Sequence, residues 1–119
     1  MPQRILVVDD ERDICDLLTI WLDDDPRCDK VMQAYDLDVA LQLADREHPD
    51  VILLDFQVGS RTSVEALPAL RRSCPKARIV IHTGSRDEAV RADVEGHGAD
   101  HILEKATVSI PDVVEVALG

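Results

Sequence analysis

Short runs of aliphatic residues recur along the chain, and each run ends directly at a polar or acidic residue. The runs Ile5–Val8, Val51–Leu54 and Ile79–Ile81 lack the polar alternation of a half-exposed strand, so they predict strands buried on both faces. Amphipathic segments with helical spacing separate these runs. Alternating strands and helices predict an α/β domain with a parallel sheet, right-handed crossovers and helices on both faces.

We expect five strands and five helices, the two remaining strands lying at 30–35 and 102–103. The first helix carries Ile14, Leu17, Leu18, Trp21 and Leu22, and we expect Trp21 and the leucines in the core. Asp36 is a suitable N-cap for the second helix.

The third helix is expected to begin at a capping box in Thr62–Glu65, and Pro68 should kink or restart it. A second capping box in Ser85–Glu88 predicts a helix that ends near Gly96 and Gly98. Ser109 or Pro111 should start the last helix.

The charge and the length restrict the function. With 119 residues, the chain is long enough for one domain, 1–119. Its formal net charge of -11 disfavours direct binding to nucleic acid or to an anionic membrane, and suits a cation or a basic protein partner. The apolar run Ile5–Val8 is too short for a signal peptide or a membrane span, so we expect a soluble, cytoplasmic protein.

Polar residues follow the predicted strands: Asp9, Asp10 and Glu11 after the first, Asp55 after the third, Thr83 after the fourth, and Glu104 and Lys105 after the fifth. Ligands of such sheets bind beyond the carboxyl ends of the strands, so these side chains should converge. Clustered carboxylates repel one another unless a proton or cation intervenes, and Mg²⁺ prefers such oxygen ligands. With a lysine and a hydroxyl beside it, the ion would complete a site for a phosphoryl group.

These residues, in this order, resemble the receiver domains of bacterial two-component response regulators over essentially the full chain. The matching segments are Ile5–Glu11, Val51–Asp55, Thr83–Gly84 and Gly98–Asp100 leading to Lys105. The resemblance implies a flavodoxin-like (β/α)5 fold, a doubly wound parallel sheet with strand order 2-1-3-4-5.

The resemblance also implies roles for the site residues. Asp55 would accept a phosphoryl group from a sensor histidine kinase or a phosphotransfer protein. Mg²⁺ would be bound by Asp10 directly, by Asp9 mainly through water, by Asp55, and by the backbone carbonyl of Gln57.

Lys105 would pair with a phosphoryl oxygen, and Thr83 would move toward the phosphoryl group. Gln57 and Ser85 occupy the positions that tune the lifetime of the phosphoryl group in this family. The chain would thus be a phosphoacceptor rather than an enzyme, signalling to a downstream protein or an output domain, with a phosphorylation-dependent homodimer as one possible form.

Three positions depart from the family pattern. Ala106 replaces the usual proline after the lysine, and a cis bond to a non-proline residue would cost about 3–4 kcal/mol. Ile102 replaces a common aromatic residue, so its coupling to Thr83 would be absent or altered. The loop Phe56–Ser60 lacks the usual proline, and Gly59 should make it more flexible.

Two other functions compete with this one. The chain could be a receiver-like module that signals by protein contact without phosphorylation. The departures at Ala106 and Ile102 would be compatible with this function. A Mg²⁺-dependent phosphatase with an aspartyl intermediate is disfavoured, because Gln57 stands where such enzymes carry a second aspartate. Asp9 and Asp10, taken alone, would also suit an ordinary solvated helix start.

Overall fold

The computed structural model describes residues 2–84 and 88–119. Its main sheet has five parallel strands, all pairing with their neighbours in the order β2-β1-β3-β6-β7. The strands are β1 (Gln3–Val8), β2 (Cys28–Ala34), β3 (Val51–Asp55), β6 (Arg78–Thr83) and β7 (His101–Glu104). This order is the predicted 2-1-3-4-5 pattern, so the predicted fold is confirmed.

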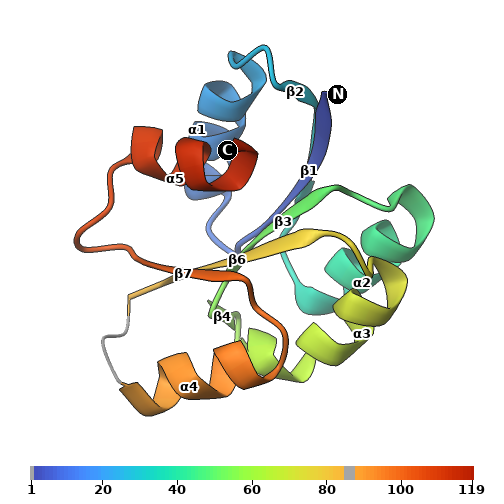
Figure 1. The fold of residues 1–119 in the computed structure, drawn as a ribbon, viewed down its shortest axis with the longest axis vertical. Helices are drawn as coiled ribbons and strands as arrows, with labels where there is room; N and C mark the ends of the chain where they lie inside the picture. Colours follow the sequence, from blue (N-terminus) through green and yellow to red (C-terminus); the bar gives the residue numbers. More distant parts are fainter. Residues whose placement is uncertain (1, 85–87) are drawn as a thin grey trace.

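Helices cover both faces of the sheet (Figure 1). On one face lie α1 (Arg12–Asp23) and α5 (Ile110–Leu118), and on the other lie α2 (Leu37–Glu47), α3 (Leu67–Ser73) and α4 (Glu88–Gly96). None of the described helices is both long and apolar enough to cross a bilayer.

The two core layers explain why the strands carry no polar alternation. In β3, Val51 and Leu53 pack toward α1 and α5, whereas Ile52 and Leu54 pack toward the opposite helices. Successive strand side chains point to opposite faces, so a strand covered on both faces needs apolar residues throughout.

The first helix corrects the expectation for its aromatic residue. The inward stripe consists of Cys15, Leu18 and Leu22, spaced three and four residues apart as one helix face requires. Trp21 is 46% exposed and Leu17 is 41% exposed. Placing these two residues in the core was therefore wrong, because Cys15 supplies the first position of the buried stripe.

Two of the four predicted helix starts are confirmed. The Asp36 carboxylate accepts a hydrogen bond from the Val39 N–H at 2.8 Å, and Ser109 forms a capping box with Asp112. The predicted box at Ser85–Glu88 includes residues outside the described part of the chain.

The predicted box at Thr62–Glu65 is wrong. Thr62 makes no side-chain capping bond, because its backbone belongs to a short strand paired with Gln57. A single 3₁₀ turn, η1 (Ser63–Glu65), follows, and α3 then begins at Leu67 with Pro68 in its first turn. The prediction that Pro68 restarts the helix is confirmed, since proline fits only a first turn.

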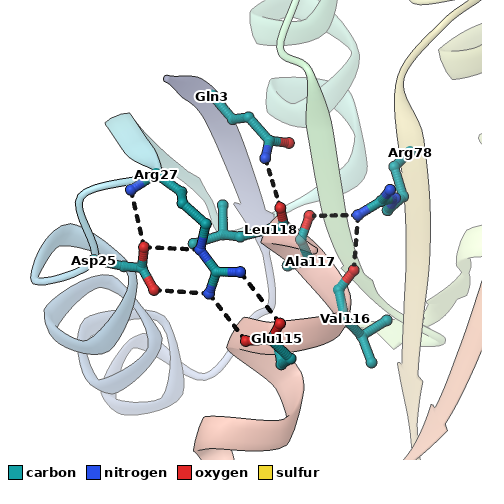
Figure 2. Close-up of polar contacts among 8 residues, drawn as sticks. All are labelled: Gln3, Asp25, Arg27, Arg78, Glu115, Val116, Ala117 and Leu118. Atoms are coloured by element: carbon teal, nitrogen blue, oxygen red, sulfur yellow. Dashed lines mark hydrogen bonds and ion pairs between the residues drawn. The ribbon is translucent and has the colours of Figure 1, made fainter. Parts of the chain in front are cut away.

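Long polar side chains fix the C-terminal end of α5 against the strands (Figure 2). Arg78 donates to the carbonyls of Val116 and Ala117 at 3.1 and 3.3 Å, and Gln3 donates to the carbonyl of Leu118 at 2.8 Å. The last carbonyls of a helix lack partners within it, so these contacts satisfy three of them.

Candidate functional site

The sheet register brings Asp9 and Asp55 together. Val8 pairs with Leu54 across β1 and β3, so the next residue of each strand segment lies at the same point of the rim. This rim is where the strand order reverses, because β2 lies on one side of β1 and β3 on the other. Such a switch point is where doubly wound sheets bind their ligands.

Three carboxylates meet at this rim. One oxygen from each of Asp9, Asp10 and Asp55 lies within 4.8 Å of the others. Asp9 is 2% exposed and Asp55 9% exposed, whereas Asp10 is exposed to solvent. Oxygens about 2.1 Å from a central Mg²⁺ lie at most about 4.2 Å apart, so the three carboxylates fit a divalent ion after a small inward adjustment.

Lys105 balances part of this negative charge. Its Nζ lies 3.2 Å from an oxygen of Asp55 and 3.7 Å from an oxygen of Asp9. The Lys105 backbone N–H donates to the Thr83 carbonyl at 2.7 Å, which fixes the start of the loop beyond β7. Burial alone would lower the pKa of Lys105, but Asp55 and Asp9 outweigh it and raise the pKa.

The environment of Asp55 disfavours its charged form. Burial raises the pKa of Asp55 to about 6, and the negative charge of Asp9 adds to the rise. Lys105 and a hydrogen bond from the backbone N–H of Gln57 oppose this rise. A bound cation would favour the ionised carboxylate, which is the nucleophilic form.

The second Asp9 oxygen is fixed by the chain itself. Asp9 Oδ1 accepts a hydrogen bond from the Glu11 N–H at 2.9 Å, while Lys105 lies nearest Oδ2. The two oxygens of Asp9 therefore have different neighbours, a backbone N–H at Oδ1 and the Lys105 ammonium at Oδ2.

Thr83 lies on the other side of Asp55. It is 1% exposed and ends β6, and a hollow of about 330 Å³ is lined there by Asp55, Phe56, Gln57, Thr83, Gly84 and Val90. The structure thus brings the predicted residues Asp9, Asp10, Asp55, Gln57, Thr83 and Lys105 to one rim. Ser85 lies outside the described residues.

His82 precedes Thr83 and is buried beside the site. Burial lowers the pKa of His82 to about 4, and the positive charge of Lys105 contributes. The imidazole therefore stays neutral at physiological pH.

The departures from the family pattern take definite forms. No described peptide bond is cis, so the chain continues from Lys105 to Ala106 along a trans path. Ile102 is partly buried and packs against the core on the α2–α3 side. The residues after Asp55 form a hairpin of β4 (Gln57–Val58) and β5 (Arg61–Thr62).

Sequence reasoning also missed a contact beside the lysine. Arg91 of α4 donates to the Glu104 carboxylate at 3.1 Å, which links α4 to the end of β7. The two residues are 13 positions apart in sequence and lie in different elements. Their contact could therefore be found only once the position of α4 relative to β7 was known.

These observations define an acidic site with a lysine at the carboxyl-end rim of a doubly wound parallel sheet. Residues 5–116 match the model of the response regulator receiver domain, and the chain belongs to this family.

Among its relatives, the chain is 30% identical over 110 residues to a protein-glutamate methylesterase/protein-glutamine glutaminase of Rhodospirillum rubrum. It is 34% identical over 121 residues to the nitrate/nitrite response regulator NarP of Escherichia coli. The matches cover 91% and 98% of this chain, but only 28% and 54% of those relatives.

Solved structures of response regulators have the same fold as this chain. A response regulator from Burkholderia pseudomallei, with a phosphorylated aspartic acid and a calcium ion, superposes with a TM-score of 0.87 at 29% identity. That match covers 98% of this chain and 66% of the other. The receiver domain of a regulator from Mycobacterium tuberculosis shares the fold with a TM-score of 0.89 at 23% identity over 98% of this chain and 94% of the other.

Proposed function

We propose that this chain accepts a phosphoryl group on Asp55 from a histidine kinase or a phosphotransfer protein, with Mg²⁺ at the acidic rim. The observation that carries the proposal is the convergence of Asp9, Asp10 and Asp55 within 4.8 Å, with the Lys105 ammonium 3.2 Å from Asp55. The phosphorylated aspartic acid and calcium ion of the Burkholderia relative support the same chemistry.

The transfer follows from the arrangement of charges. An Asp55 oxygen forms a bond to phosphorus while the phosphorus–nitrogen bond of the donor phosphohistidine breaks, and the imidazole leaves with the bonding electrons. Mg²⁺, when bound by Asp10, Asp55 and the Gln57 carbonyl, supplies positive charge that offsets repulsion between carboxylate and phosphoryl group.

Side chains of the protein would hold the remaining phosphoryl oxygens. Lys105 is placed to hold a phosphoryl oxygen, since its ammonium already lies at the Asp55 carboxylate. Thr83 faces the same hollow and offers a hydroxyl to another oxygen. Holding the reacting atoms in line lowers the barrier without further covalent chemistry.

The test uses a small phosphodonor. Incubation with Mg²⁺ and acetyl phosphate should add the mass of one phosphoryl group to the wild-type chain and none to Asp55→Asn. Equal modification of both chains, or none of the wild type, would contradict the proposal.

A receiver-like module that works without phosphorylation is the second candidate. The packing of Ile102 into the core, where an aromatic switch residue is common in the family, favours it. Wild-type chain that remains unmodified with Mg²⁺ and acetyl phosphate would support this candidate.

A further inference from the structure

The segment after Asp55 is built as a two-strand hairpin. Gln57 pairs with Thr62 and Val58 with Arg61, in antiparallel register. Gly59, in the turn between them, has φ of 64°, a left-handed conformation that glycine adopts without steric cost. The proposed metal ligand Gln57 therefore belongs to a defined element.

One side of the hairpin is fixed to the core. The Phe56 N–H donates to the His82 carbonyl at 3.3 Å, and the Ser63 N–H donates to the Phe56 carbonyl at 2.7 Å. Val58 is buried against the core on the α2–α3 side. These contacts hold the base of the hairpin beside β6.

Arg61 holds the other side. Its Nη1 donates to Asp38 in the first turn of α2 at 2.9 Å, and its Nε donates to Glu65 in η1. The guanidinium therefore joins strand β5 of the hairpin to the first turn of α2 and to η1. Arginine suits this bridge because its rigid fork can engage two carboxylates at once.

We propose that Arg61 is a positioning residue for the metal site, because its bridge to Asp38 and Glu65 holds the hairpin that keeps Gln57 beside Asp55. This inference rests on the proposed function. Arg61 touches neither the metal nor the phosphoryl group in this role, and acts through the backbone of the hairpin.

The size of the effect follows from the exposure of the bridge. The Arg61 side chain is 44% exposed, and exposed ion pairs contribute only modestly. We therefore expect Arg61→Gln to weaken Mg²⁺ binding about two- to fivefold, with the melting temperature nearly unchanged.

The direction of the change in Mg²⁺ affinity separates a positioning role of Arg61 from a simple charge effect. Removing a positive charge from so acidic a chain should by itself strengthen Mg²⁺ binding. Arg46→Gln is the matched control, because Arg46 is an exposed arginine near the other end of α2 whose nearest carboxylate oxygen lies 3.8 Å away. The control should bind Mg²⁺ as tightly as the wild type or tighter, whereas Arg61→Gln should bind it more weakly.

Two measurements on the wild type and variants test the role. Isothermal titration calorimetry with MgCl₂ gives the affinity, and amide hydrogen exchange of residues 57–62 in metal-free protein reports opening of the hairpin. We expect Arg61→Gln to raise exchange in 57–62 and to leave exchange in β6 unchanged. Asp38→Asn should raise exchange in 57–62 as well, with Asp45→Asn as its control.

The turn offers an independent perturbation. In the described part of the chain, nothing lies within 4 Å of a Cβ added at Gly59, so the backbone conformation is what opposes a substitution there. Gly59→Ala should weaken Mg²⁺ binding and raise exchange in 57–62, because the alanine Cβ disfavours the positive φ of this turn position.

The outcomes separate the two proposals. Arg61→Gln with wild-type or tighter Mg²⁺ binding and wild-type exchange would overturn the role of Arg61 while leaving the phosphoacceptor function intact. A wild-type chain that takes up no Mg²⁺ would contradict the proposed function instead. The exchange of 57–62 would then still decide whether Arg61 holds the hairpin.

Discussion

The Lys105 ammonium lies 3.2 Å from the Asp55 carboxylate, across the gap between the ends of β7 and β3. The same ammonium lies 3.7 Å from Asp9, so one cation serves two buried carboxylates. The rim thus keeps an excess of negative charge, and several measurable properties depend on it.

Replacing Lys105 should slow phosphorylation more than it weakens the fold. Lys105→Met removes the positive charge that would hold a phosphoryl oxygen, and loss of one such group typically slows a reaction about 10²–10³-fold. We expect the rate with acetyl phosphate to fall by about this factor. Lys76→Met, an exposed lysine beside Arg4 and Arg78 at the opposite end of the strands, should leave the rate unchanged, and an equal loss there would refute a local role.

Asp55→Asn should stabilise the metal-free fold at neutral pH. Burial raises the pKa of Asp55 from its ordinary value of 3.8 to about 6, so the folded state binds the proton more tightly than the unfolded state. Stability then falls as pH rises through this interval. Asparagine removes the cost, which at pH 7.5 amounts to about 2–3 kcal/mol.

Urea unfolding of both chains in EDTA between pH 4 and 7.5 measures this effect. The stability difference between Asp55→Asn and wild type should be largest at pH 7.5 and should shrink toward pH 4. A difference that grows toward low pH would mean that the ionised carboxylate is stabilised by the fold.

Mg²⁺ should stabilise the wild type and act much less on Asp10→Asn. A ligand at 100 times its dissociation constant stabilises a fold by about 2.7 kcal/mol. Asp10 is the exposed member of the carboxylate cluster, and without its charge the ion loses a direct ligand. Thermal melts with and without MgCl₂ measure the shift, and Asp45→Asn should retain the full wild-type response.

Alanine substitutions at the neighbouring residues Leu18 and Leu17 should differ sharply in their effect on the free energy of unfolding. Leu18 is 1% exposed and Leu17 is 41% exposed. We expect Leu18→Ala to cost about 2–5 kcal/mol of unfolding free energy and Leu17→Ala less than about 1 kcal/mol. Chemical denaturation of both variants tests the assigned inward face of α1, and equal losses would show the assignment to be wrong.

Two serines should respond in opposite directions to alanine. The Ser63 hydroxyl is buried and has no hydrogen-bond partner among the described residues, so Ser63→Ala should be neutral or stabilise by up to about 1 kcal/mol. Ser109 caps α5, so Ser109→Ala should destabilise by about 0.5–2 kcal/mol. Thermal unfolding decides both, and a marked loss for Ser63→Ala would reveal an additional partner of its hydroxyl.

The site could be predicted because its residues follow the strands. Asp9, Asp55, Thr83 and Lys105 occupy strand ends, and parallel strands deliver such positions to one rim. The position of Asp9 opposite Asp55 follows from the pairing of Val8 with Leu54.

Other features lay beyond local reasoning. The outward position of Trp21 depends on which face of α1 meets the sheet, and an amphipathic pattern with apolar residues on both flanks leaves that face open. The hairpin at 57–62 depends on the burial of Val58 and on the reach of Arg61 to Asp38, which are 23 residues apart in sequence.

The sequence by itself determined the fold class, the strand order expected from the family resemblance, and the identity of the acidic rim, because periodicity and strand-end positions are local properties. The tertiary structure alone decided how far Asp55 is buried, which carboxylates share Lys105, and how Gln57 is held. These depend on distances between separate elements, and charges interact through distance and burial rather than through sequence order.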